Sequence, residues 1–172
     1  MLNRSFLVGC GVGGNNPEST DWRIEFISFP SGNLVAYAVD FREVASGSFV
    51  LNADDLTQSL GGTASASSSL LNSSIFGPGP AFNTGAWYPT GGDAQPWLRW
   101  TFASKQRLRE IVFSNNSGSG PSVIRLSYLS GSTWIPLYTW SGLTWSGDGS
   151  SSDETKVFTV GDPTPASQIN YF

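Results

Sequence analysis

The stretch from Pro96 to Phe113 constrains the fold of this chain more than any other. Its first half, PWLRWTF, alternates, because Leu, Trp and Phe stand at every second position and Trp, Arg and Thr stand between them. A period of two places successive side chains on opposite faces of an extended chain, as in a half-buried β-strand. After a basic turn, Leu108, Ile111 and Phe113 supply another apolar face. We therefore expect two adjacent strands at the centre of a sheet.

Several other segments carry strand signals separated by turn residues. Residues 21–28 and 34–44 alternate on either side of a Pro-Ser-Gly-Asn turn, so we expect them to form a hairpin. A second hairpin is predicted around Ser130-Gly131, and an extended segment over 63–71. Residues 72–95 read as one long ordered loop with embedded aromatics. We expect Trp97, Trp100 and Trp134 to pack in the core.

The composition agrees with an all-β chain of about one domain. Of 172 residues only 13% are charged, while 20 are Gly and 10 are Pro, and no segment shows a helical period. We predict an antiparallel β-sandwich of the jelly-roll type with extended N- and C-terminal arms. The expected divisions are an arm at 1–20, a domain at 21–160 that includes a lead-in hairpin over 21–50, and a tail at 161–172.

Charge and residue usage exclude several classes of function. The net charge of −4 disfavours nucleic acid and anionic membranes as partners. The chain has no His, which removes the usual general base, and a single Cys, Cys10, which excludes an internal disulfide. The carboxylate pairs Asp54-Asp55 and Asp153-Glu154 lie in polar connections, where solvated loops are expected. We therefore predict that the protein is not an enzyme.

The sequence predicts no membrane insertion, because no apolar run approaches the roughly 20 residues of a membrane span. The segment Leu7-Val8-Gly9-Cys10 looks like a lipoprotein cleavage box. The apolar run before Cys10 is, however, shorter than the hydrophobic region of a signal peptide. We expect no lipid attachment there.

Four segments together resemble the discoidin family, also called coagulation-factor type C domains, which have a galactose-binding-like jelly roll. The resemblance covers roughly 64–160. It rests on an Ala/Ser-rich opening, an Ala-Phe-Asn loop that precedes a Trp, a pair of core strands, and a hairpin that leads to a Trp. These segments are Ala64–Ser69, Ala81–Trp87, Trp97–Phe113 and Ile124–Trp134.

An upstream pair of motifs extends the resemblance to bacteriophage virion proteins. Asp21-Trp22-Arg23-Ile24 and Asp40-Phe41-Arg42-Glu43 look like the lead-in that accompanies such modules in those proteins. The resemblance implies a structural protein of a tail, baseplate, tail fibre or capsid decoration. Its partners would be other virion proteins in a homo- or hetero-oligomer. The arms, with Phe6, Leu7, Tyr171 and Phe172, would either fold back on their own domain or dock on neighbouring subunits.

The resemblance also bears on cofactors. Sugar-binding relatives hold a Ca²⁺ near the loop where this chain has Asn83, and the family usually has Asp at that position. A carboxylate is the stronger ligand for a hard cation. Asn83 is therefore only a weak candidate ligand, and we predict no cofactor. Ser130 likewise stands where the hairpin of the family usually has Asp.

Candidate carbohydrate-binding residues lie in the loops. Trp87 and Tyr88 either stack on a sugar ring or anchor the long loop, and Trp145, in a Gly/Ser loop, either binds or packs. Asp93 is a plausible partner for sugar hydroxyl groups. These residues support host-surface glycan attachment by a virion protein. The alternative is a carbohydrate-binding module or adhesin of a secreted or cell-surface bacterial protein, which would place the chain outside the cell and not in a virion.

Overall fold

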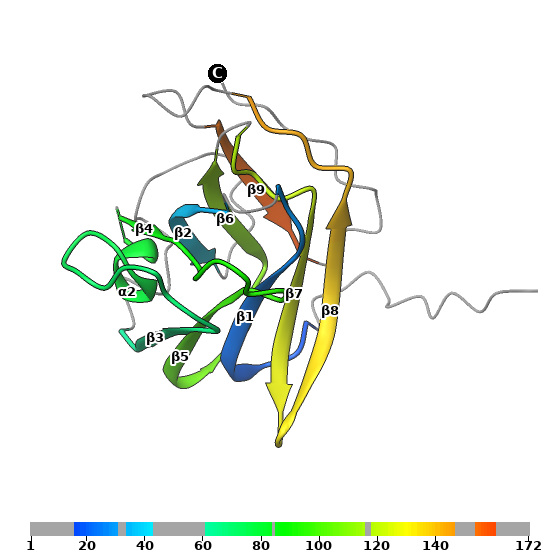
Figure 1. The fold of residues 1–172 in the computed structure, drawn as a ribbon. Coiled ribbons are helices and arrows are strands. Elements are labelled where there is room, and N and C mark those ends of the chain that lie inside the picture. The colour runs from blue at the N-terminus through cyan, green and yellow to red at the C-terminus, as the bar shows by residue number, and fades with distance from the viewer. Residues whose placement is uncertain are drawn as a thin grey trace, which may run out of the picture.

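The computed structural model describes residues 16–30, 34–42, 61–83, 85–115, 118–146 and 154–160. The strands of these residues lie in two antiparallel sheets, so the predicted all-β class is confirmed (Figure 1). The prediction of one long loop over 72–95 is wrong, because this segment contains a short helix, α2 (Pro78–Ala81), and a two-residue strand, β4 (Ala86–Trp87).

The five-stranded sheet has the order β3-β5-β1-β7-β8 and the four-stranded sheet the order β4-β2-β6-β9. The first sheet contains β3 (Thr63–Ala66), β5 (Trp97–Gln106), β1 (Ser19–Ser28), β7 (Val123–Ser130) and β8 (Thr133–Ser141). The second contains β4 (Ala86–Trp87), β2 (Ala36–Arg42), β6 (Glu110–Asn115) and β9 (Glu154–Thr159), and α2 spans Pro78–Ala81.

Aromatic side chains join the two sheets into a sandwich. Phe26 on β1 meets Phe113 on β6 edge to face, with ring centroids 6.1 Å apart. Trp140 on β8 meets Phe158 on β9 in the same way, at 5.4 Å. Phe82, just after α2, contacts the ring of Trp100 on β5 at 5.0 Å. One buried hydrophobic cluster therefore extends between the sheets.

The alternation expected over 21–28 is confirmed, but the hairpin expected with 34–44 is wrong. Trp22, Ile24 and Phe26 are fully buried on one face of β1. β1 pairs with β5 and β7, whereas β2 pairs with β4 and β6 in the other sheet. The chain crosses the sandwich between them. A turn sequence shows where a strand stops but not whether the next strand pairs with it or faces it across the core.

The strands of the Pro96–Phe113 stretch are likewise not neighbours in one sheet. β5 lies in the five-stranded sheet and β6 in the four-stranded sheet. The link between them is held by the second sheet, because the N–H of Arg109 donates to Arg42 O and the N–H of Val160 donates to Arg109 O. The inward residues of β5, Leu98, Trp100 and Phe102, are buried as predicted. They belong to the sheet opposite β6 and do not pair beside it.

The hairpin predicted at Ser130-Gly131 is confirmed, since β7 pairs with β8 from Ser130 and Thr133 onward. Gly131 has a φ of 61°, a conformation that favours glycine.

Of the three tryptophans expected in the core, only Trp100 is there. Trp97 and Trp134 are half-buried on the outer face of the five-stranded sheet, where Arg23 stacks on the Trp134 ring.

The two ends of the described chain lie side by side. The side-chain amide of Asn16 donates to the backbone oxygens of Leu108, at 2.9 Å, and Val160, at 3.3 Å. Ser19 and Thr20, which were expected in the N-terminal arm, already belong to β1. Residues 1–15, 43–50 and 161–172 lie outside the described residues, so the arms and the end of the lead-in segment stay predictions.

Candidate functional site

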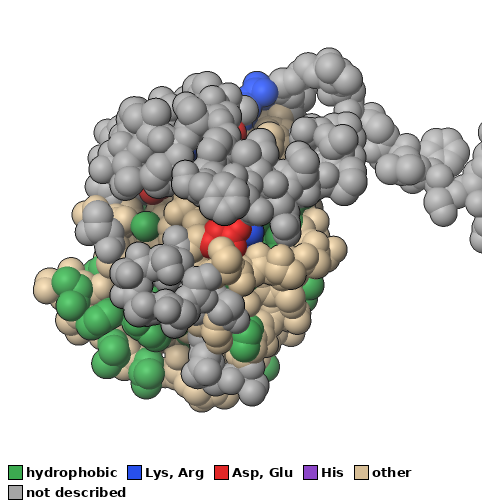
Figure 2. All heavy atoms as spheres, turned by 90° about the horizontal axis from the view of Figure 1, so that it is seen from above, with side chains coloured by type: hydrophobic (Ala, Val, Ile, Leu, Met, Phe, Trp, Pro, Cys, Tyr) green, Lys and Arg blue, Asp and Glu red, His purple; other side chains and the backbone are tan. Residues whose placement is uncertain are grey.

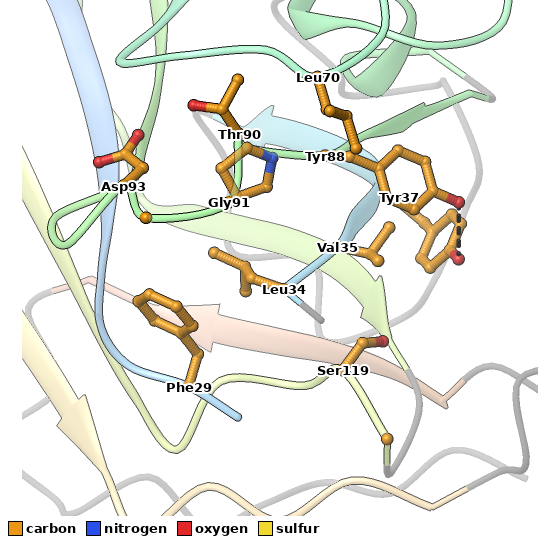
Figure 3. A pocket seen from close by; sticks show the side chains of 13 residues that line it. Phe29, Leu34, Val35, Tyr37, Leu70, Tyr88, Thr90, Gly91, Asp93 and Ser119 are labelled. Atoms are coloured by element: carbon orange, nitrogen blue, oxygen red, sulfur yellow. Dashed lines mark hydrogen bonds between the residues drawn. The ribbon is translucent and has the colours of Figure 1, made fainter. Parts of the chain in front are cut away.

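A cleft of about 340 Å³ opens at the end of the sandwich where β1 stops (Figure 3). One wall comes from Tyr88–Asp93, after β4, and the other from Phe29 and the residues that lead into β2, including Leu34 and Val35. Ser119, from the connection between β6 and β7, lies at one end. The volume is within the range of about 300–1,000 Å³ typical of small-ligand sites. Apolar side chains and polar groups contribute to the lining in nearly equal measure.

Tyr88 is the predicted sugar-binding residue that the structure places most directly at this cleft. Its hydroxyl group lies 3.4 Å from that of Tyr37, within hydrogen-bond distance. Its ring meets the edge of Phe76 with centroids 5.6 Å apart. These two contacts fix the ring while leaving it half-buried. A fixed aromatic ring with part of its surface accessible is what a sugar-stacking platform requires.

Asp93 also lines the cleft, but its carboxylate organises the loops. Oδ2 accepts hydrogen bonds from the hydroxyls of Ser67 and Ser68, each at 2.6 Å, and Oδ1 accepts one from the N–H of Gln95 at 3.2 Å. Partial burial alone would raise the pKa of Asp93. The hydrogen bonds from Ser67, Ser68 and Gln95 outweigh burial and lower that pKa below its usual value. The carboxylate therefore stays ionised and holds the loop after β3 against the loop before β5.

Trp87 is an anchor of the long loop and has no surface for a ligand. It is 0% exposed, and its indole N–H donates to Ser68 O at 2.7 Å. Its ring lies 5.7 Å from that of Phe26. The sequence left open whether Trp87 stacks on a sugar or anchors the loop, and the structure shows that it is a packed anchor. A neighbouring pair of aromatics in a loop gives no signal of which ring turns inward.

Trp145 is packed as well, with only 9% of its surface exposed. Its indole N–H donates to Pro121 O at 2.8 Å, its ring lies 5.2 Å from that of Phe113, and the Lys156 ammonium sits 5.1 Å from the ring centroid. Gly120 lies directly against the ring, and a Cβ there would overlap it. Trp145 therefore closes one side of the core and offers no free face to a sugar.

The other predicted site residues are not gathered at the cleft. Asn83 is exposed just after α2, and among the described residues no group of three or more Cys, His, Asp or Glu could hold a metal. Glu154 is paired with Lys156 and accepts hydrogen bonds from Ser146. The remaining candidates lie outside the described residues, namely Asp54, Asp55, Asp153, Phe6, Leu7, Tyr171 and Phe172.

An apolar rim beside the cleft was not expected from the sequence. Leu70, which lines the cleft, is 59% exposed, and Ile75 is 58% exposed, with Leu71 also exposed between them. Figure 2 shows hydrophobic side chains gathered on one side of the molecule. The sequence did not predict the exposure of Leu70, Leu71 and Ile75, because a few apolar residues in a Ser-rich loop show no periodicity. Tyr37 and Phe29 were missed for another reason, since they reach the cleft only through the crossover between sheets.

Comparisons with known proteins gave no match. A scan against protein-family models, a search of curated proteins and a search of solved structures each found none. In the part of the chain that the structure describes, no helix is both long and apolar enough to cross a membrane.

Proposed function

We propose that this chain is a non-enzymatic jelly-roll protein of a bacteriophage particle that holds a host-surface glycan in the Tyr88 cleft. The observation that carries the glycan part is the cleft itself, in which a fixed tyrosine ring stands opposite Leu34 and Val35. The hydroxyl group of Thr90 lies at its exposed margin, whereas that of Ser119 is buried and donates to Asn115 Oδ1 at 2.8 Å. Sugars present an apolar ring face bordered by hydroxyl groups, and this lining matches both.

The position of the cleft suits attachment. β1 begins beside Gln106, close to where the described chain starts and ends. At the other end of β1, Phe29 follows the last strand residue and lines the cleft. A strand rises roughly 3.3 Å per residue, so the ten residues of β1 separate these two regions by about 30 Å. Assembly through the arms at one end would leave the cleft at the other end facing outward.

The virion part of the proposal rests on the resemblance of the lead-in motifs and of the segments over 64–160 to discoidin-like virion modules. The two described antiparallel sheets form a sandwich, and we propose that its topology is a jelly roll. The first lead-in motif lies on β1 and most of the second on β2, both inside their sheets. We propose that the arms, through Phe6, Leu7, Tyr171 and Phe172, bury apolar surface on neighbouring virion subunits. No cofactor is part of the proposal.

A glycan array probed with the wild type and Tyr88→Ala tests the cleft. We expect the variant to bind about tenfold more weakly, because the stacking ring is lost. Tyr88→Phe, which keeps the ring, should retain most of the binding. Tyr138→Ala is the matched control, because it removes another half-buried tyrosine, on β8 and outside the cleft. An array on which the wild type binds nothing, or Tyr88→Ala binds equally, would overturn the proposed ligand.

Deletion of residues 1–15 and 161–172 tests the virion role. We expect the truncated chain to fold, to keep glycan binding and to be absent from purified particles. Normal incorporation into particles would contradict the assembly role of the arms. Glycan binding in a chain that never enters particles would favour the alternative, a module of a secreted or cell-surface bacterial protein.

A further inference from the structure

A second cavity, of about 310 Å³, lies on the outer face of the five-stranded sheet beside Asp93. Asp93 lines both cavities, so the loop that carries it separates the second cavity from the Tyr88 cleft. Its charged lining consists of two arginines, Arg23 and Arg125, and two carboxylates, Glu25 and Asp93. Trp97 and Ile27 make an apolar wall. None of the site residues expected from the sequence, apart from Asp93, belongs to it.

The carboxylates at this cavity are each engaged by three donors from the protein itself. Glu25 pairs with Arg23 and with Arg125 Nε, and Ser127 Oγ donates to it at 3.0 Å. Asp93 accepts its own three hydrogen bonds from Ser67, Ser68 and Gln95. The two negative groups are therefore committed within the fold and do not face an incoming ligand as free acceptors.

The groups that stay available are donors. Arg125 donates to Glu25 only from Nε, and its two terminal amino groups make no hydrogen bond among the described residues. Arg23 Nε also lacks a partner, but it is buried and its guanidinium packs on the Trp134 ring, so Arg23 is not among the available donors. The side chain of Gln95 is exposed, and the Trp97 indole N–H donates to no described residue. A guanidinium group with two free amino groups recognises a carboxylate through two parallel hydrogen bonds.

The arrangement of these groups selects among anions. Trp97 is half-buried, and Ile27 is 45% exposed, which is unusual for an isoleucine at the end of a strand. A flat apolar wall beside a guanidinium that keeps two unbonded amino groups suits a ring that carries a carboxylate better than it suits a bare anion. The whole chain carries a net charge of −4, so long-range attraction does not draw an anion here and recognition has to be local.

We infer that this second cavity binds the carboxylate of an acidic sugar, with Arg125 pairing the carboxylate and Trp97 contacting the ring. The inference rests on the proposed function and deepens it. It names the ligand as an acidic glycan, one residue of which lies in the Tyr88 cleft and another, a uronic acid type of sugar, across the Asp93 loop.

The test is a nuclear magnetic resonance titration of the full chain that follows the indole N–H of Trp97. The probes are sodium glucuronate, glucose and sodium acetate. We expect glucuronate to shift the Trp97 signal and to bind about tenfold more tightly than glucose or acetate, because only glucuronate uses both the guanidinium and the apolar wall. Equal affinity for glucose, equal affinity for acetate, or no shift with glucuronate would overturn the inference.

Variants locate the binding group. Arg125→Gln should weaken glucuronate binding about tenfold, and Arg125→Lys should give an intermediate loss, because a lysine keeps the charge without the paired donors. Arg99→Gln is the matched control. Arg99 lies on the same face, pairs with Asp21 at 2.5 Å and does not line the cavity. If Arg99→Gln weakened binding as much as Arg125→Gln, the assignment to this cavity would be wrong.

The two proposals fail in distinguishable ways. Glucuronate binding at Trp97 together with an array on which no glycan binds would support the cavity and contradict the proposed function. Array binding that depends on Tyr88 but is unchanged in Arg125→Gln would support the proposed function and contradict the second cavity. If a variant unfolds, the wild-type titration with the three probes still decides the chemistry.

Discussion

Glu25 shows how one residue can stabilise the outer face of a sheet. It is only 7% exposed although it points away from the core, because Arg23 and Arg125 cover it from the same and the neighbouring strand. Burial alone would raise the pKa of the Glu25 carboxyl. Hydrogen bonds from Arg125 and Ser127 and the nearby arginine charges outweigh burial, so the pKa lies below its ordinary value of 4.5.

Glu25→Gln should therefore lower the free energy of unfolding in a pH-dependent way. At pH 7 we expect a loss of about 1–3 kcal/mol, since hydrogen bonds to a charged group are replaced by weaker ones. A folded-state pKa below the unfolded value means that the stabilisation is fully present above about pH 4.5 and is lost as pH falls through the folded-state value. Urea unfolding of the wild type and Glu25→Gln between pH 7 and pH 3 measures the difference in their free energies of unfolding.

The control for this prediction is Glu18→Gln. Glu18 pairs with Arg107 at 2.9 Å, but its side chain is largely exposed. We expect this variant to change stability little, because exposed ion pairs contribute little. If the stability difference between the wild type and Glu25→Gln stayed constant down to pH 3, the predicted coupling of stability to the Glu25 pKa would be wrong. It would also be wrong if that difference grew as the pH was lowered.

At the scale of the element, β2 departs from the regular alternation that its sequence predicts. The alternation expected over 34–44 is interrupted, because the pairing register with β6 shifts between Tyr37 and Asp40. Ala38 lies at the shift with a φ of 45°. The irregularity lets Tyr37 reach the cleft while Val39 and Phe41 stay in the core. A side chain at positive φ costs roughly 1–2 kcal/mol.

Ala38→Gly should accordingly stabilise the protein. Glycine adopts positive φ without that cost, although it has more entropy to lose on folding, so we expect a net gain of about 0.5–1 kcal/mol. Ala36→Gly in the same strand is the matched control. Ala36 is fully buried with a regular backbone, and its replacement should cost about 1 kcal/mol. Urea unfolding of both variants checks the pair, and a destabilised Ala38→Gly would show that the backbone at this position is not strained.

Strand positions were predictable at this scale, whereas pairing was not. Alternation located β1, β5 and β7, because a half-buried strand must place apolar residues on one face. Nothing in a turn such as 30–33 tells whether the chain returns beside β1 or crosses to the opposite sheet. For the same reason the sequence identified Tyr88 and Asp93 but not the opposite wall of the cleft, which depends on that crossover. Trp87 and Trp145 were ambiguous because ring orientation depends on packing partners distant in sequence.

At the scale of the whole molecule, the two sheets end in strands whose outer edges can pair with other chains. β8 is the longest of these edge strands, with nine residues, and it pairs only with β7 among the described strands. It carries aromatic and aliphatic residues that favour pairing with a further strand. Pro136 lies in its middle, next to a register shift at Leu126 and Ser127. Proline on an edge strand removes a donor and blocks pairing, which natural sheets use to avoid aggregation.

Pro136→Thr should therefore increase self-association of the isolated chain. The substitution restores a backbone N–H and a residue that favours strands, so two β8 edges could pair across a symmetric interface. We expect a concentration-dependent dimer in sedimentation velocity that the wild type lacks or forms less readily. Pro30→Thr, at an exposed proline outside the strands, should leave the distribution unchanged. If Pro136→Thr sedimented like the wild type at every concentration, the proline would not protect this edge, and the twist at the register shift would have to be sufficient by itself.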